Sequence, residues 1–409
     1  MKNWQIKLSL YINYFVFAIL LNSVGIVIQK AINRYMVGEA SAAYLEMAKD
    51  MSILGVSFLL GSFLPRLGYK RGMLLGLAVA FCGCLAMYFG NSFNSSLVLF
   101  GLTGIGFAFI KLSVYSLIGL VTNNAKEHNS LMSSVEGVFM MGIALAYFLF
   151  PAFYSDTNPD AWLRVYLLLA VLVAMSFVLL LFTPLDETEV KTTTNIGEDF
   201  AGMFKLVSLP MVIAFIFCAF LFVMTEQGIM SWLPTFNQKI LKLSETMSVQ
   251  MAAILAVSLA FGRIAAGQLT KHISWLVLLS VCIVISMAIV VVVLPQTLDL
   301  KIPTVTSFSN IPLIAFVFPL IGLFIAPIYP LINSVVLSSL PKAKHSAMTG
   351  LLTVFSALGG TIGSRIIGIL FENIGGAKAF YFLLIPMALL LIALLVFNQL
   401  ANKNKIAAS

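Results

Sequence analysis

The sequence predicts an all-α membrane protein with twelve transmembrane helices in two six-helix bundles. Its 409 residues are 60% hydrophobic and only 10% charged, and its mean hydropathy is +1.03. Soluble domains carry about 25% charged residues, whereas a transmembrane helix needs about 20 consecutive apolar ones. Short alternating segments would indicate a β-barrel, but the apolar runs here are long and unbroken.

The apolar runs fall into two groups of six. The first group covers residues 8–29, 47–66, 71–90, 96–121, 131–152 and 163–183. The second group covers residues 206–234, 248–269, 274–295, 312–339, 346–371 and 378–399. The outer loop Lys30–Asp50 is unusually long and charged, and we expect it to contain a short extra helix.

The longest polar interruption separates the two groups. It predicts an N-terminal bundle (1–183), a cytoplasmic linker (184–205) and a C-terminal bundle (206–409). With the N-terminus inside, thirteen Lys and Arg residues fall in inside segments and eight in outside segments. The positive-inside rule then places both termini in the cytoplasm. We expect a multi-pass protein of a bacterial inner membrane.

The composition also argues against several classes of function. A net charge of +8 distributed over the loops of a membrane protein does not indicate nucleic-acid binding. The sequence has no phosphate-binding loop, no Ser-His-Asp set and no metal-ligand spacing of Cys or His. We therefore expect a monomeric transporter rather than an enzyme, with no cofactor and no metal, driven by an ion or solute gradient.

The two halves share a weak internal repeat. The second span ends in Gly61-Ser-Phe-Leu-Pro-Arg-Leu-Gly-Tyr-Lys-Arg71, and the eighth ends in Gly262-Arg-Ile-Ala-Ala-Gly-Gln-Leu-Thr-Lys-His272. Parallel six-helix repeats are typical of secondary transporters, whose substrate site lies between the repeats near the bilayer midplane.

Together with the twelve spans and the central charged linker, the first of these loops resembles the major facilitator superfamily. The resemblance implies a gating role for Arg66, Lys70 and Arg71, although Pro65 replaces the acidic residue usual in that family. Arg263, near the inner end of the eighth span, is expected to tie cytoplasmic helix ends together and so contribute to gating.

Within the superfamily, the seventh span is similar to the fucose:proton symporter group. It reads Phe-Leu-Phe-Val-Met-Thr-Glu226-Gln-Gly-Ile-Met-Ser-Trp232, with an acid followed by a Ser-Trp pair. The proline-containing tenth span, with Tyr329, is also similar to that group. This resemblance implies proton coupling and a sugar-like substrate. The fourth span lacks the group's Asn-Pro pair, and in the first span Asn22 is the polar residue nearest to the missing acid.

Two charges lie inside the fourth and fifth spans, namely Lys111 and Glu136. A charge at membrane depth costs at least about 2.5–3.5 kcal/mol and is retained where it has a partner or a water-filled cavity. We consider a structural ion pair, a lysine that faces the cavity and binds an anionic or hydroxyl-rich substrate with Tyr115 nearby, and a lysine that snorkels to the interface. Glu136 is also a candidate proton carrier.

Further polar groups lie inside spans of the second half. Glu226 serves either an interhelical hydrogen bond or a functional role in proton coupling or substrate contact, and Gln227 follows it. Arg365 lies beside Gly359 and Gly363, whose spacing predicts close helix packing but does not explain the arginine. We expect Arg365, Gln227, Tyr329 and Asn22 to bind substrate.

The tenth span contains Pro319, Pro327 and Pro330. Prolines remove backbone hydrogen bonds and kink a helix. Pro327 and Pro330 therefore predict either a flexing gate or a static kink.

The function that these features favour is a proton-coupled symporter that imports a sugar or sugar-like organic acid by alternating access. A proton-driven efflux antiporter for drugs or metabolites is the alternative, although the fifth span lacks the Gly-Pro-rich motif common in such antiporters. A non-transporting receptor is disfavoured, because a scaffold has little use for costly buried charges.

Overall fold

The computed structural model describes residues 4–121, 125–185, 207, 209–270, 272–298, 303–338 and 345–408. By their contacts, the residues form two compact units. The first comprises Met1–Met36 and Leu45–Ile196, and the second comprises Val37–Tyr44 and Gly197–Ser409. The predicted linker falls largely on residues 186–205, which lie outside the described residues, so its boundaries stay a prediction.

The predicted fold class is confirmed. Among the described residues, eleven helical segments are long and apolar enough to cross a membrane. A further helix, α4 (Tyr44–Leu67), supplies the second of the twelve spans.

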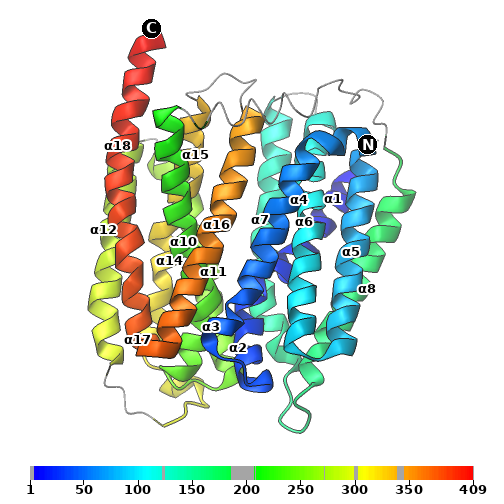
Figure 1. Cartoon of the computed structure of the whole chain (residues 1–409), viewed down its shortest axis with the longest axis vertical. Coiled ribbons are helices and arrows are strands. Elements are labelled where there is room, and N and C mark those ends of the chain that lie inside the picture. Colours follow the sequence, from blue (N-terminus) through cyan, green and yellow to red (C-terminus); the bar gives the residue numbers. More distant parts are fainter. Residues whose placement is uncertain are drawn as a thin grey trace. The chain divides into compact units, whose positions relative to one another are not determined.

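The first unit is built from antiparallel helices (Figure 1). Its long elements are α1 (Trp4–Asn22), α2 (Val24–Tyr35), α4, α5 (Tyr69–Gly90), α6 (Phe93–Val121), α7 (Ala125–Leu149) and α8 (Arg164–Phe182). Two short 3-10 turns, η1 (Pro151–Phe153) and η2 (Ala161–Leu163), lie between α7 and α8. Helix α5 packs against both α6 and α8, while α1 packs against α7.

A glycine contact sets the spacing of α5 and α6. A Cβ atom at Gly76 would lie 2.7 Å from the carbonyl oxygen of Gly106, and one at Gly106 would lie 2.6 Å from that of Gly76. Small residues of this kind let membrane helices approach closely. This contact also limits the rotation of α6 about its axis, and therefore the direction of the face that carries Phe107 and Lys111.

The second unit is centred on α10 (Pro210–Lys239), which packs against α11, α16 and α18. Its other helices are α3 (Glu39–Ala42), α11 (Glu245–Leu269), α12 (Trp275–Val293), α16 (His345–Ile374), α17 (Gly376–Ala379) and α18 (Leu384–Ala408). Ser244 directly precedes α11, and its hydroxyl accepts a hydrogen bond from the Met247 backbone N–H at 3.4 Å. This is the side-chain cap that serines commonly supply.

Helices α10 and α16 lie in close contact, as the glycine spacing of the eleventh span predicts. A Cβ at Gly359 or Gly363 would collide with the backbone of Phe220 or Met224 in α10. The Trp232 indole donates to the carbonyl and hydroxyl oxygens of Ser364 at 2.9 and 3.1 Å.

Trp232 also stacks on Phe371, with ring centroids 5.4 Å apart. Trp232 of the Ser-Trp pair identified in the sequence therefore fastens α10 to α16 and fixes the rotation of the helix that carries Glu226.

The tenth span is broken, as its prolines predict. It consists of α13 (Ile314–Val317), the 3-10 turn η6 (Phe318–Leu320), α14 (Ile321–Ile325) and α15 (Ile328–Ser338). Pro319 lies in η6, buried Pro327 separates α14 from α15, and exposed Pro330 lies in α15. Whether this helix flexes stays a prediction.

The predicted outer loop Lys30–Asp50 is wrong in extent. It contains the expected short helix α3, but its ends belong to α2 and α4. Lys30 lies inside α2 with its ammonium 3.7 Å from the ring centroid of Tyr154. An aromatic face can stabilise a cation in this way. The charged Lys30 side chain is therefore accommodated within α2 instead of lying in a loop.

Candidate functional site

Glu226 and Arg263 meet in the second unit. Oε1 of Glu226 on α10 lies 3.5 Å from Nη2 of Arg263 on α11, and these side chains are 12% and 33% exposed. Packing of α10 against α11 brings the two together. The sequence predicts both residues as functional but contains no signal that they form a pair.

Tyr329 lies next to this ion pair. Helix α15 packs against α10, and the rings of Tyr329 and Phe222 have centroids 5.7 Å apart. Phe222 and Glu226 are one helical turn apart, so they share a face of α10. Tyr329 interacts electrostatically with both Glu226 and Arg263. We call Phe222, Glu226, Arg263 and Tyr329 the Glu226 cluster; Gln227, which is half-buried, directly follows it in α10.

A second cluster lies in the first unit around Lys111 of α6. The Lys111 ammonium lies 5.8 Å from the ring centroid of Phe107 and 6.0 Å from that of Tyr115. Tyr14 of α1 adds a third ring to this group, with its centroid 6.2 Å from that of Phe107 and 6.3 Å from that of Tyr115. The amine thus lies against an aromatic wall that can hold a cation while leaving its N–H donors available.

Glu136 of α7 completes this group, which we call the Lys111 cluster (Tyr14, Phe107, Lys111, Tyr115 and Glu136). The Tyr115 hydroxyl donates to Oε1 of Glu136 at 2.7 Å. Glu136 also acts electrostatically on Lys111, but the described residues include no ion pair of 4.0 Å or less between the two. Lys111, Tyr115 and Glu136 all retain some accessible surface. The structural and the substrate-binding roles of Lys111 both stay predictions.

Arg365 and Asn22 lie outside both clusters. Nη2 of Arg365 donates to the Tyr44 hydroxyl at 3.2 Å, and its guanidinium lies 4.2 Å from the centre of the Tyr44 ring. Asn22 donates to the Ala18 carbonyl of its own helix at 2.9 Å. Binding of substrate by either side chain stays a prediction.

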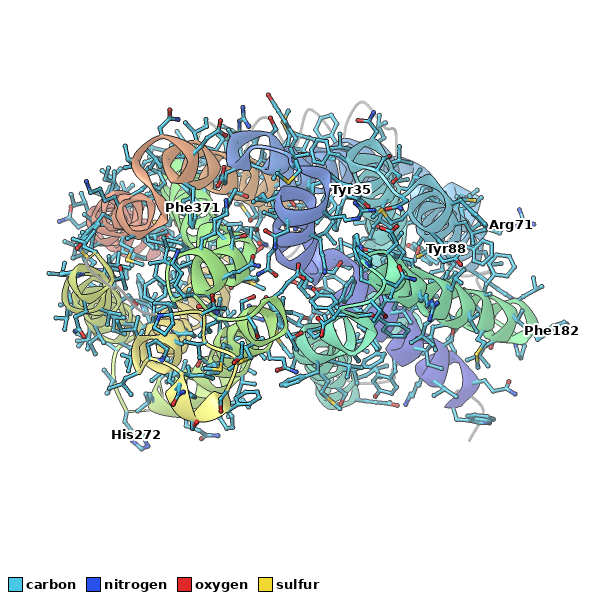
Figure 2. The ribbon with its side chains drawn as sticks, turned by 90° about the horizontal axis from the view of Figure 1, so that it is seen from below. Tyr35, Arg71, Tyr88, Phe182, His272 and Phe371 are labelled. Atoms are coloured by element: carbon cyan, nitrogen blue, oxygen red, sulfur yellow. The ribbon has the colours of Figure 1, made fainter. Side chains whose placement is uncertain are left out.

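The basic residues at the end of α4 and the start of α5 have different surroundings. Nζ of Lys70 donates to the carbonyl oxygens of Leu181 and Thr183 at 3.0 and 2.7 Å, and so caps the C-terminal end of α8. Arg71 is exposed (Figure 2). The side chain of Arg66 lies outside the described residues. The gating role of all three stays a prediction.

Several charged residues that the sequence does not single out form contacts. Glu46 pairs with Lys49 inside α4 although both are buried, and Asp50 lies 3.6 Å from Lys49. The carboxylate of Glu39 pairs with Lys239. An i, i+3 spacing could have indicated the first pair, whereas the second joins residues far apart in sequence. Among the described residues, no three His, Cys, Asp or Glu side chains form a group that could hold a metal.

Comparison with known proteins identifies the fold. The family model of the Major Facilitator Superfamily matches residues 8–303 of this chain. A D-xylose–proton symporter aligns with a TM-score of 0.74 and 13% identity, over 97% of this chain and 97% of that one. The E. coli fucose:proton symporter FucP aligns with a TM-score of 0.63 and 14% identity, over 99% of both chains.

A third solved structure, the nucleoside transporter NupG, aligns with a TM-score of 0.70 and 15% identity, over 96% of this chain and 98% of that one. At these identities the likeness shows the fold alone. No match was found among curated protein sequences.

Proposed function

The chain belongs to the major facilitator superfamily, and on that premise we propose that it is a proton-coupled symporter that imports a sugar or sugar-like organic acid. Sugar–proton symporters are among the structures that share its fold. The observation that carries the proposal is the Glu226 cluster, in which a membrane-embedded carboxylate lies 3.5 Å from the guanidinium of Arg263.

The chemistry of this pair suits proton coupling. The charged form of Glu226 is stabilised by Arg263, and the neutral form avoids the cost of a charge at membrane depth. Both protonation states are therefore accessible. Protonation of Glu226 weakens its contact with Arg263. The guanidinium of Arg263 can then interact with Tyr329 and with an incoming solute.

The Lys111 cluster supports an acidic substrate. Its ammonium lies beside aromatic faces while Glu136 accepts from Tyr115. A carboxylate on a sugar acid would gain a charge-assisted hydrogen bond from Lys111. The flat aromatic side chains offer apolar contact to the C–H face of a sugar ring.

Proteoliposomes test the coupling. With the inside alkaline and the outside acidic, we expect the wild-type protein to accumulate a solute from a panel of hexoses, pentoses, hexuronates and aldonates. Glu226→Gln should abolish accumulation but retain exchange of labelled for unlabelled solute. Asp156→Asn, in an exposed loop, is the matched control and should behave as wild type.

The outcomes separate the candidate functions. Accumulation by Glu226→Gln at the wild-type level would remove Glu226 from the coupling role. Solute expulsion driven by the same proton gradient would instead favour the efflux antiporter.

A second experiment tests the substrate class. Lys111→Met should raise the KM for a sugar acid about tenfold or more, equivalent to about 1.4 kcal/mol of binding, and leave the KM for a neutral sugar nearly unchanged. Equal loss for both solutes would contradict a role of Lys111 in recognising a carboxylate.

A further inference from the structure

Lys111 and Glu136 carry opposite charges inside the first unit but do not pair with each other. The Lys111 ammonium lies 5.8 Å from the ring centroid of Phe107 and 6.0 Å from that of Tyr115. Glu136 acts on Lys111 electrostatically, yet among the described residues no ion pair of 4.0 Å or less joins them. Opposite charges attract strongly where the dielectric constant is low, so another contact must hold these two apart.

Tyr115 is the side chain that contacts both charges. It lies one helical turn after Lys111 on α6, and Phe107 lies one turn before it, so the three side chains share one face of the helix. The Tyr115 ring lies near the ammonium, while its hydroxyl donates to Oε1 of Glu136 at 2.7 Å. A hydrogen bond to a carboxylate is stronger than one between neutral groups. It therefore keeps the carboxylate directed at Tyr115.

Aromatic packing fixes the helices around this contact. The ring centroid of Tyr14 on α1 lies 5.5 Å from that of Phe139 on α7 and 6.2 Å from that of Phe107 on α6. Phe139 and Phe107 are also 6.0 Å apart, and Phe139 lies about one turn after Glu136. Rotation of the Glu136 side chain is therefore a smaller change than displacement of α6 or α7.

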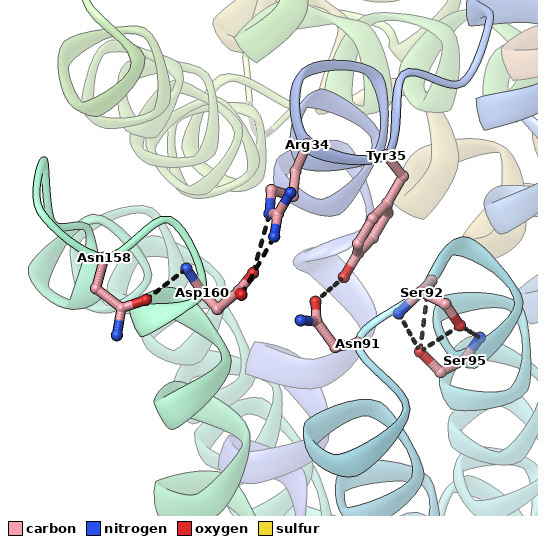
Figure 3. Close-up of polar contacts among 7 residues, drawn as sticks. All are labelled: Arg34, Tyr35, Asn91, Ser92, Ser95, Asn158 and Asp160. Atoms are coloured by element: carbon pink, nitrogen blue, oxygen red, sulfur yellow. Dashed lines mark hydrogen bonds and ion pairs between the residues drawn. The ribbon is translucent and has the colours of Figure 1, made fainter.

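The outer end of the first span is held within the same unit (Figure 3). Arg34 of α2 donates to both carboxylate oxygens of Asp160 at 2.9 and 3.2 Å. The Tyr35 hydroxyl donates to Oδ1 of Asn91 at 3.1 Å. These contacts tie α2, which continues the span of α1, to the end of α5 and to the loop before α8. The Tyr14 ring thus belongs to a span that is anchored at its outer end.

We propose that Tyr115 is a positioning residue that holds Glu136 away from Lys111, and so keeps the ammonium available to the carboxylate of a solute. Without the hydroxyl, Glu136 turns to the ammonium and competes with an acidic substrate. A pair of this kind changes what Lys111 binds more than it changes stability, because the cost of dehydrating two charges offsets most of their attraction. The effect on binding rests on the proposed acidic substrate, but the position of Glu136 relative to Lys111 does not.

The NMR signal of Lys111 tests this role without any solute. In the full chain with isotope-labelled lysine, the peak that disappears in Lys111→Arg identifies that signal. Tyr115→Phe keeps the ring and removes only the hydroxyl. It should move the signal of the lysine ε-CH₂ protons downfield, because the ammonium leaves the aromatic rings for Glu136, and adding Glu136→Gln should reverse the shift. Tyr147→Phe removes a buried hydroxyl from the helix that carries Glu136 and should leave the signal unchanged.

Equilibrium binding of two probe solutes tests the consequence for recognition. D-glucuronate carries a carboxylate, whereas D-glucose is neutral. Tyr115→Phe should weaken D-glucuronate binding about tenfold, as expected for loss of one charged hydrogen bond, and leave D-glucose binding nearly unchanged. Adding Glu136→Gln to Tyr115→Phe should restore the affinity for D-glucuronate, because the amide carries no charge. Glu136→Gln alone should bind D-glucuronate at least as tightly as the wild type.

The outcomes separate this role from the alternatives. An unchanged Lys111 signal in Tyr115→Phe would overturn the proposal. A loss of D-glucuronate binding that Glu136→Gln fails to restore would also overturn it, since Tyr115 would then contact the solute directly. If Tyr115→Phe does not fold, weaker D-glucuronate binding by Glu136→Gln alone would have the same meaning. Binding of neither solute by the wild type would count against the proposed function, and the Lys111 signal would still decide the role of Tyr115.

Discussion

Replacing Gly106 by alanine should destabilise the first unit, because its position leaves no room for a methyl group. The added Cβ would lie 2.6 Å from the carbonyl oxygen of Gly76 and 3.1 Å from two ring atoms of Phe17. Ordinary contact begins at 3.4 Å, so the shortfall against the backbone oxygen is 3.4 − 2.6 = 0.8 Å. The oxygen belongs to a helix and cannot rotate away, so α5 and α6 must separate.

The expected cost follows from this overlap. Overpacking by a methyl group typically costs about 1–3 kcal/mol, and alanine in place of a helical glycine returns about 0.5–1 kcal/mol. We therefore expect Gly106→Ala to lower the free energy of unfolding by up to about 2.5 kcal/mol. Equilibrium unfolding in mixed detergent and SDS measures this quantity.

Gly137→Ala is the matched control, since a Cβ at Gly137 of α7 meets no atom within 4 Å. It should be neutral or stabilising by up to about 1 kcal/mol. Equal effects of the two substitutions would refute the argument that the glycine contact sets the spacing of α5 and α6.

Three further predictions concern polar contacts. Tyr115→Phe removes the donor to Glu136 and should lower the free energy of unfolding by about 0.5–2 kcal/mol, with Glu136→Gln in the same background showing little additional loss. Lys70→Ala uncaps α8 and should cost about 0.3–1 kcal/mol in the same assay, whereas Lys70→Arg should retain most of it. The hydrogen bond from Arg34 lowers the pKa of Asp160, so the stabilisation from this contact is complete above the unfolded value of about 3.9 and is lost as the pH falls through the lower folded value. Arg34→Gln should abolish that acid-dependent loss, which is small because both side chains are well exposed.

The sequence predicts the spans well because the bilayer imposes one simple rule on them. A spanning segment must be helical and mostly apolar over about 20 residues, and this rule alone locates the helices to within a few residues. The broken tenth span and the close contact of α10 with α16 also follow from local features, namely its prolines and the spacing of Gly359 and Gly363.

Contacts between residues far apart in sequence could not be predicted in this way. Nothing in the sequence connects Glu226 to Arg263, or Glu39 to Lys239, because each pair depends on how helices rotate and pack. Periodicity is also uninformative here, since lipid-facing and buried positions are both apolar. Arg365 shows the result: a charge inside a span indicates a functional group, but its partner, Tyr44, lies in a segment that the sequence predicts as a loop.

The stacking of Arg365 on Tyr44 has a consequence for mutational scanning and for homologous sequences. A guanidinium that both stacks on a ring and donates to its hydroxyl cannot be replaced by lysine without losing the planar contact. Positions 44 and 365 should therefore covary, with an aromatic residue at the first whenever arginine occupies the second. Inactive Arg365 variants consequently need to be compared with Tyr44 variants before the loss is attributed to a missing substrate contact.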